Sequence, residues 1–316
     1  MGRYIVRRIL WMIPVLLFIS VVTFALVHAV PGGPFDREKP LPAEIQANLN
    51  KFYGLDQPIY KQYSDWMGLT RNPSGEYHGV LQGKFGPSYA SRSRTVNDIF
   101  RDHLPVSAQL GLAALAIALV VGVPLGVLAA LKQNSIWDYF SMTVAIFGVS
   151  VPSVVLGPVF MLFFGLTLKW FPIAGWGQQW TQIIMPATAL GLGSSALIAR
   201  LTRASMLQVI REDYIRTARS KGLSEFTVVV RHAVKNAFIP VATILGPMFA
   251  ALVTGTFVIE QIFAIPGMGR FFIRSITNRD YPVVMGTTLL YAVFLVVANL
   301  AVDITYAFLD PRIRFE

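Results

Sequence analysis

The sequence predicts an all-α integral membrane protein with about six transmembrane helices. Of its 316 residues, 54% are hydrophobic and 14% are charged, against about 45–50% and about 25% in an average soluble domain. The chain also contains six long stretches without Asp, Glu, Lys or Arg, more than the core of a water-soluble chain of this length could hide. Lipid is therefore the expected surrounding of most of the chain.

The first uncharged stretch covers residues 9–30 and follows three arginines, a pattern that signal peptides share. The stretch is too long for the apolar part of a signal peptide, and it ends in Pro31-Gly32-Gly33 rather than in a small-x-small cleavage site. We therefore expect residues 1–30 to form an N-terminal segment and a retained first transmembrane helix.

Residues 31–104 have a different character, with nine basic and eight acidic residues and a turn signal at 72–75. Aromatic side chains accompany them at Tyr53, Tyr60, Tyr63 and Trp66. This composition predicts a small folded extracytoplasmic cap, with a short helix or two near residues 48–63 and no catalytic constellation.

The other uncharged stretches are residues 105–131, 139–168, 183–199, 237–259 and 281–302. Each could cross about 30 Å of hydrocarbon as a helix, although the stretch at 183–199 needs its polar flanks to reach. Pro152 and Gly255 are among the residues that interrupt the third and fifth spans. Such breaks are typical of helices that line an aqueous cavity, but Gly and Pro are also commoner in membrane helices generally. Residues 105–316 are thus the expected membrane core.

The distribution of basic residues predicts which side of the membrane each loop occupies. Six crossings put both termini on one side, and the segments on that side carry fourteen Lys and Arg, against four in the short loops opposite. Because basic residues favour the cytoplasm, both termini are expected there. The net charge of +10 follows from this bias, and neither a single basic patch nor a nucleic-acid-binding motif accompanies it. The chain has no cysteine, which excludes disulfides and thiol chemistry.

The segment at 200–235, expected in the cytoplasm, is far longer than a connection between neighbouring helices needs. Asp213 begins a helix-forming run that Arg219 and Lys221 end, which matches the helix dipole. Gly222 then fits a helix stop and Ser224 the N-cap of a second helix. The second helix carries an apolar stripe at i, i+3, i+4, i+7 and i+8, formed by Phe226, Val229, Val230, Ala233 and Val234. Two such helices suit docking into a groove on a cytoplasmic partner, or contact with anionic lipid.

The same segment resembles a known coupling motif. Asp213-Tyr-Ile-Arg-Thr-Ala-Arg-Ser-Lys-Gly222, followed by Arg231-His-Ala-Val-Lys-Asn-Ala-Phe-Ile-Pro240, is similar to the motif of permease subunits in binding-protein-dependent ABC importers. The motif usually opens with Glu-Ala-Ala, where this chain has Arg216-Thr217-Ala218, and carries Ile where this chain has His232. Peptide-importer members commonly share both departures. Further matches lie at 54–58, 83–86, 129–132, 260–269, 278–282 and 310–314, so the resemblance to the B-type permease of oligopeptide importers covers nearly the whole chain.

The resemblance implies an ABC type I importer permease with coupling helices at 208–235, in a bacterial or archaeal cytoplasmic (inner) membrane. It implies a second homologous permease subunit in a heterodimer, two cytoplasmic ATPase subunits and an extracytoplasmic peptide-binding protein, with no nucleic acid. ATP and Mg would be used by the ATPase subunits, and this chain itself would hold no cofactor or metal and catalyse nothing. The residues expected to couple to the ATPase are Asp213, Arg216, Ala218, Arg219, Lys221, Gly222 and Leu223. Pro152, Gly255 and Glu260 are candidates for the substrate pathway or gate.

Several alternatives remain at this stage. The short outer loop at 169–182 favours oligopeptides over dipeptides, and nickel and glutathione importers use the same scaffold. A proton-driven peptide transporter would need buried carboxylates or histidines, which the middle thirds of the spans lack. An intramembrane enzyme would need a His partner for Ser194 or Ser195, and no span provides one at a comparable depth. The chain has no phosphate-binding Gly-x-x-x-x-Gly-Lys loop, so it is not expected to hydrolyse ATP by itself. A purely structural anchor would leave the long cytoplasmic helices unexplained.

Overall fold

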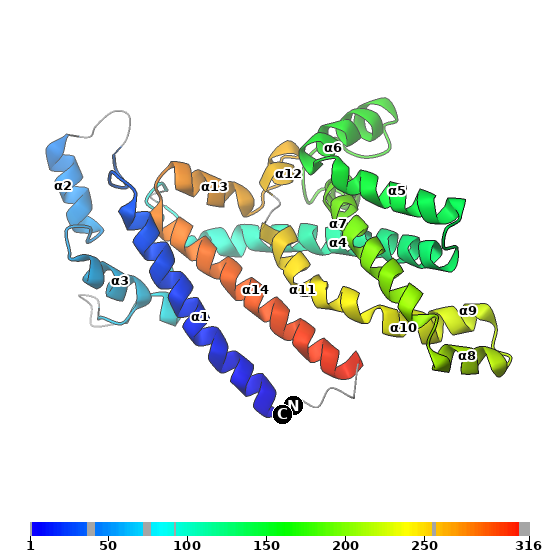
Figure 1. Cartoon of the computed structure of the whole chain (residues 1–316). Helices are drawn as coiled ribbons and strands as arrows, with labels where there is room; N and C mark the ends of the chain where they lie inside the picture. The colour runs from blue at the N-terminus through cyan, green and yellow to red at the C-terminus, as the bar shows by residue number, and fades with distance from the viewer. Residues whose placement is uncertain (1, 37–41, 72–76, 92, 255–256, 310–316) are drawn as a thin grey trace. The chain divides into compact units, whose positions relative to one another are not determined.

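The computed structural model describes residues 2–36, 42–71, 77–91, 93–254 and 257–309. Within these ranges every regular element is a helix, and the only bridges between extended residues are Arg71 with Tyr77 and Pro87 with Thr95. The helices are α1 (Gly2–Ala29), α2 (Ala43–Phe52), α3 (Ile59–Met67), η1 (Val80–Gln82), α4 (Val96–Leu131), α5 (Ile136–Ser150), α6 (Ser153–Phe160), η2 (Met161–Thr167), η3 (Trp180–Ile183), α7 (Ile184–Val209), α8 (Asp213–Ser220), α9 (Glu225–Thr227), η4 (Val228–Ala233), α10 (Val234–Ala237), α11 (Ile239–Thr254), α12 (Phe257–Ile262), α13 (Gly269–Thr277) and α14 (Tyr281–Leu309) (Figure 1). The prediction of an all-helical chain is confirmed.

Four of the described helices are long and apolar enough to cross a membrane unaided, and the count rises to six when each of two bent helix pairs is taken as one span. The first bent pair is 136–150 with 153–167, at an angle of 98°. The second is 225–237 with 239–253, at 54°. Pro152 and Pro240 stand at these breaks, where a residue without a backbone N–H cannot continue the helical hydrogen bonding. The number of spans agrees with the sequence, whereas the third span is sharply bent rather than straight.

The described residues form two compact units. Of these residues, the larger unit contains 2–8, 106–254, 257–266 and 294–309, and the smaller unit contains 9–36, 42–71, 77–91, 93–105 and 267–293. The expected cap at 31–104 lies in the smaller unit, where it packs with parts of α1, α13 and α14. Its two short helices, α2 and α3, confirm the prediction of a helix or two there, with bounds shifted to 43–67.

Close contacts at small residues hold the larger unit together. A Cβ atom on Gly122 of α4 would lie 2.6 Å from the backbone oxygen of Ser195 in α7, and one on Gly126 would lie 2.5 Å from that of Ala199. Glycine at these positions lets the helix backbones approach as closely as they do in other membrane proteins. Beyond this contact, Leu110, Leu156, Met185, Ile259, Phe263 and Ile265 form the centre of a buried apolar cluster.

A buried carboxylate and two apolar clusters organise the smaller unit. Asp280 is 2% exposed and accepts hydrogen bonds from the Ser88 hydroxyl at 2.5 Å and the Tyr89 backbone N–H at 3.0 Å. These contacts fix the loop before α4 to the residue that precedes α14. One cluster joins the start of α4 to α13 and α14, and the other joins α1 and α3 to the first turns of α14.

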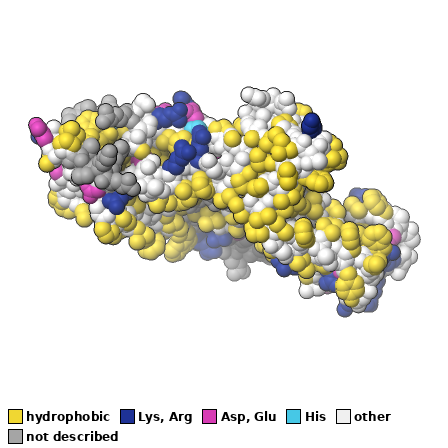
Figure 2. Space-filling view, turned by 90° about the horizontal axis from the view of Figure 1, so that it is seen from above, with side chains coloured by type: hydrophobic (Ala, Val, Ile, Leu, Met, Phe, Trp, Pro, Cys, Tyr) yellow, Lys and Arg dark blue, Asp and Glu magenta, His cyan; other side chains and the backbone are white. Residues whose placement is uncertain are grey.

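Large apolar side chains remain exposed over much of the surface, as Figure 2 shows for one face of the molecule. Phe18 is 69% exposed, Val120 is 72% exposed and Phe147 is 65% exposed. All three lie on helices that are long and apolar enough to span a membrane, alone or as part of a bent pair. A soluble protein rarely leaves such extensive apolar surface to water, so these side chains suit contact with lipid.

Candidate functional site

The hairpin of α8, α9, η4 and α10 follows α7 in the larger unit, and it is the segment that the sequence singles out for docking (Figure 1). α8 ends in a Schellman motif. The Gly222 N–H donates to the Arg219 carbonyl at 2.9 Å, and the Leu223 N–H donates to the Ala218 carbonyl at 3.4 Å. Gly222 has a φ of +74°, a left-handed conformation that side chains with a Cβ rarely adopt. The predicted glycine stop is confirmed.

Side chains stabilise the turn on both sides. The Ser224 hydroxyl accepts a hydrogen bond from the Thr227 N–H at 3.4 Å, which confirms Ser224 as the N-cap of the second helix. The Arg219 guanidinium donates two hydrogen bonds to the Glu225 carboxylate, at 2.7 and 3.1 Å. This bidentate pair joins the end of α8 to the start of α9.

The hairpin has its own apolar core, which also contacts α4 and α7. The buried members are Ala130, Met206, Ile215, Ala218, Val228, Val229, Ala233 and Ala237. The stripe expected from helical spacing is therefore partly wrong, because Phe226 is 77% exposed and Val230 is 51% exposed. The reason is that residues 228–233 form a π-helix, whose i→i+5 hydrogen bonds place Val228 and Ala233 on the same face.

The structure separates the predicted coupling residues into two groups. Six of them are exposed on the hairpin: Asp213, Arg216, Arg219, Lys221, Gly222 and Leu223. Ala218 is 6% exposed and lies in the hairpin core, so it can support the exposed surface but not contact a partner there. Tyr214 and Phe226 are exposed apolar residues that the sequence analysis did not name as coupling residues. The Asn236 side-chain amide donates a hydrogen bond to the Tyr214 hydroxyl at 2.7 Å. The sequence spacing of these two residues does not predict this contact.

The three pathway candidates lie in different surroundings. Pro152 is exposed at the break between α5 and α6. Gly255 lies outside the described residues, as do 72–75 and 310–314. Glu260 is 1% exposed and accepts a hydrogen bond from the Ser107 hydroxyl at 2.6 Å. In this structure Glu260 is thus buried in the larger unit against Ser107 of α4, and its part in a pathway stays a prediction.

Two ion pairs in the larger unit tie helices together. Asp303 accepts from Arg8 at 2.6 Å, which joins α14 to α1. Asp138, which is 3% exposed at the start of α5, accepts two hydrogen bonds of 2.7 Å from Arg203 on α7. The second pair was not predicted, although Asp138 directly precedes the stretch at 139–168 and Arg203 follows the stretch at 183–199 by one helical turn on the same expected side. Among the described residues, no group of His, Asp and Glu side chains could hold a metal ion.

Comparison with known proteins places these features in context. A family model described as "binding-protein-dependent transport system inner membrane component" matches residues 122–315, and a model of the N-terminal part of such membrane components matches residues 1–111. The chain is 43% identical over 316 residues to the dipeptide transport system permease protein DppB of Bacillus subtilis (strain 168), covering 100% of this chain and 99% of that protein. It is 41% identical over 316 residues to the oligopeptide transport system permease protein OppB of Salmonella typhimurium, covering 100% of both chains.

A solved structure shares part of the fold. A chain of the MetNI methionine ABC transporter, in an inward-facing conformation, superposes with a TM-score of 0.55 at 17% sequence identity. The match covers 67% of this chain and 96% of that chain. The helical arrangement is therefore shared with an ABC transporter subunit.

Proposed function

Because the chain belongs to the family of inner membrane components of binding-protein-dependent transport systems, we propose that it forms one half of the translocation pore of an ATP-driven peptide importer. The observation that carries this proposal is the exposed hairpin at the end of α7, together with similarity over the full length to two peptide permeases. In this proposal the second half of the pore is a homologous permease subunit, and two ATPase subunits bind ATP and Mg in the cytoplasm. An extracytoplasmic protein delivers the peptide.

The hairpin surface has the chemistry of a docking site. Apolar side chains at Tyr214, Leu223 and Phe226 stand beside the charged Arg216 and the Arg219–Glu225 pair. Such a surface fits a cleft that buries the apolar groups and leaves the charges at its rim. The sequence also allowed the hairpin to contact anionic lipid. The alternation of charged and apolar groups around the turn favours docking into a protein cleft.

The packing of the hairpin suggests how motion would pass to the pore. Its core includes Met206 of α7 and Ala130 of α4, so the hairpin moves together with the ends of two membrane helices. Closure of the ATPase subunits can shift the pore only if its two states contact the ATPase differently. A hairpin that packs on α4 and α7 would pass such a difference on to the two membrane helices.

For the substrate, we propose oligopeptides, with dipeptides as the nearest alternative and nickel or glutathione behind them. Loop length no longer separates the first two, because a relative named as a dipeptide permease matches this chain over 99% of its own length. A wide and weakly polar pathway suits both classes. A proton-driven mechanism is disfavoured, because Glu260, Asp303 and Asp138 each have a hydrogen-bonding or ionic partner rather than forming a relay.

The test is ATPase activity of the complex in lipid, formed from this chain, its partner permease and the ATPase subunits. The binding protein is added empty, or loaded with peptides of graded length. We expect peptide-loaded binding protein to stimulate hydrolysis, with the length dependence ranking the substrates. A chain that moves peptide alone, driven by a proton gradient, would contradict the proposal.

A further inference from the structure

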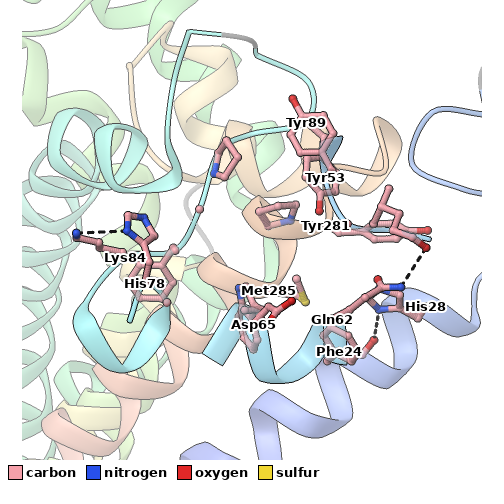
Figure 3. Close-up of a pocket in the computed structure, with 18 of the residues that line it drawn as sticks. Phe24, His28, Tyr53, Gln62, Asp65, His78, Lys84, Tyr89, Tyr281 and Met285 are labelled. Carbon is pink, nitrogen blue, oxygen red and sulfur yellow. Dashed lines mark hydrogen bonds between the residues drawn. The ribbon is translucent and has the colours of Figure 1, made fainter. Parts of the chain in front are cut away.

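The smaller unit contains a cavity that neither the proposed pore nor the coupling hairpin uses. Its volume is about 380 Å³, at the lower end of the roughly 300–1,000 Å³ range of ligand pockets. It lies between the end of α1, the loop after α2, α3, the segment at 78–89 and the start of α14. Figure 3 shows side chains from these elements arranged around an open centre.

Aromatic rings form most of the wall. Phe24 is 5% exposed and stacks on His28, with ring centroids 4.1 Å apart. Tyr53 and Tyr89 pack with centroids 4.6 Å apart, and Tyr281 completes that side of the cavity. Because these rings hold each other in place, the cavity is preformed and suited to an apolar side chain.

One hydrogen-bond donor in the wall has no partner. The indole N–H of Trp66 is buried and makes no hydrogen bond among the described residues. An indole N–H can only donate, and buried donors without partners are rare in native proteins. The N–H is also closed to the cavity, so an acceptor such as a peptide carbonyl reaches it only when the ligand turns the indole. Burial, and secondly the Asp280 carboxylate, raise the pKa of Tyr89, so its phenol also stays protonated as a donor.

Charges of both signs lie among the exposed lining residues. The Lys84 ammonium lies 3.4 Å from Nδ1 of His78, and both residues line the cavity. Asp65 provides a carboxylate, one oxygen of which accepts a hydrogen bond from Thr70. An ammonium and a carboxylate beside an apolar cavity complement a small zwitterion with an apolar body.

We propose that this cavity binds a short peptide with free ends and at least one apolar side chain. The apolar side chain lies among the rings, a backbone carbonyl accepts from Trp66, and the peptide carboxylate and ammonium face Lys84 and Asp65. The inference rests on the proposed function as a peptide importer, and it adds a peptide site built only from the smaller unit.

The first test is direct binding to the complete transporter in lipid nanodiscs, without binding protein or ATP. The probes are radiolabelled Leu-Phe and its carboxyl-terminal amide. We expect saturable binding, with the free acid about tenfold tighter than the amide because of the charged contact to Lys84. Trp66→Phe keeps an aromatic ring, although a smaller one, and removes the donor, so Leu-Phe should bind about fivefold more weakly. Lys84→Gln should abolish the preference for the acid, and because Lys84 is exposed this variant should fold normally.

Matched controls are Trp180→Phe, at an indole that is 79% exposed in the larger unit, and Lys51→Gln, at an exposed lysine outside the cavity wall. Both should bind Leu-Phe as the unaltered protein does. A photoreactive dipeptide should label segments 52–55, 65–66 and 281–285. Absence of saturable binding, labelling confined to the larger unit, or an acid preference that survives Lys84→Gln would overturn the inference. Peptide uptake is measured in parallel. Normal peptide uptake without peptide binding in this cavity rejects this site alone. Absence of peptide-stimulated ATPase activity in the unaltered complex rejects the proposed function.

Discussion

At the scale of single residues, Gly222 is the sharpest test of the coupling hairpin. Its φ is +74°, and no atom lies within 4 Å of a Cβ added to it. Gly222→Val would therefore introduce backbone strain of about 1–2 kcal/mol rather than a clash. We expect the hairpin surface to be distorted, so that peptide uptake falls at least about tenfold while the complex still assembles.

Gly177 is the matched control for this variant. It also has a left-handed φ, +83°, and open space around it, but it lies in the loop before η3. Gly177→Val carries the same strain and should leave uptake in reconstituted vesicles unchanged. Normal uptake by Gly222→Val would show that the turn does not transmit motion.

The sequence predicted the caps of the hairpin but not which side chains of its second helix are buried. Gly222 and Ser224 were predictable because capping depends on residues within one turn of each other. Phe226 and Val230 were misplaced because their assignment assumed 3.6 residues per turn, which the π-helix at Val228–Ala233 does not follow. Nothing in the composition of that segment marks the change of helix type.

The buried pair of Asp138 and Arg203 allows a second prediction. Arg203→Gln leaves an uncompensated carboxylate that is 3% exposed. We expect a loss of about 3 kcal/mol, at the lower end for a broken buried pair because Arg203 is partly solvated. The measurement is the midpoint of thermal unfolding in detergent.

Two controls bear on this pair. The double variant Asp138→Asn with Arg203→Gln removes the unpaired charge and should recover much of the lost stability. Arg219→Gln breaks a pair whose Glu225 side chain is 59% exposed, so its effect should stay below about 1 kcal/mol. Equal losses for Arg203→Gln and Arg219→Gln would show that burial of the first pair has no energetic consequence.

At the scale of elements, the contact of α4 with α7 depends on backbone approach. In an ordinary helix, Gly→Ala stabilises by about 0.5–1 kcal/mol. At Gly126 the added Cβ would lie 2.5 Å from the Ala199 backbone oxygen, so the helices would have to move apart. We therefore expect Gly126→Ala to lower the unfolding temperature, against the trend of helix propensity.

Gly193 on α7 provides the comparison for Gly126. The nearest atom to its added Cβ is the Gly148 oxygen at 3.7 Å, an ordinary contact. Gly193→Ala should thus be neutral or stabilising in the same unfolding assay. If both variants were stabilising, the close approach of α4 and α7 would not be needed for the fold.

For the break in the third span, the sequence predicted the position but not the angle. Pro152 marked the position of the break, because a proline cannot donate the next helical hydrogen bond. The angle of 98° between residues 136–150 and 153–167 depends on how the second part packs. Gly157 of α6 lies against Ile259 and Ile262 of α12, more than a hundred residues later in the chain. Local sequence cannot specify that contact.

At the scale of the whole molecule, composition predicted the number of spans but not the two units. Uncharged length is a local property, and lipid imposes it on each span separately. The smaller unit instead depends on contacts such as Ser88 with Asp280, which are 192 residues apart. The cavity wall likewise combines Phe24, Trp66 and Tyr281 from three distant segments. A single sequence carries no signal for such pairings.

The orientation of the chain in the membrane is directly testable because the sequence contains no cysteine. Single cysteines can therefore be introduced at Leu81, which is 61% exposed in η1, and at the exposed Arg231 of the hairpin. The excess of basic residues around the hairpin predicts that it lies in the cytoplasm. We expect a membrane-impermeant maleimide to label Leu81→Cys in intact cells, and to label Arg231→Cys only after the membrane is opened. The reverse pattern would place the hairpin outside, where no ATPase subunit could reach it, and would remove the basis for coupling.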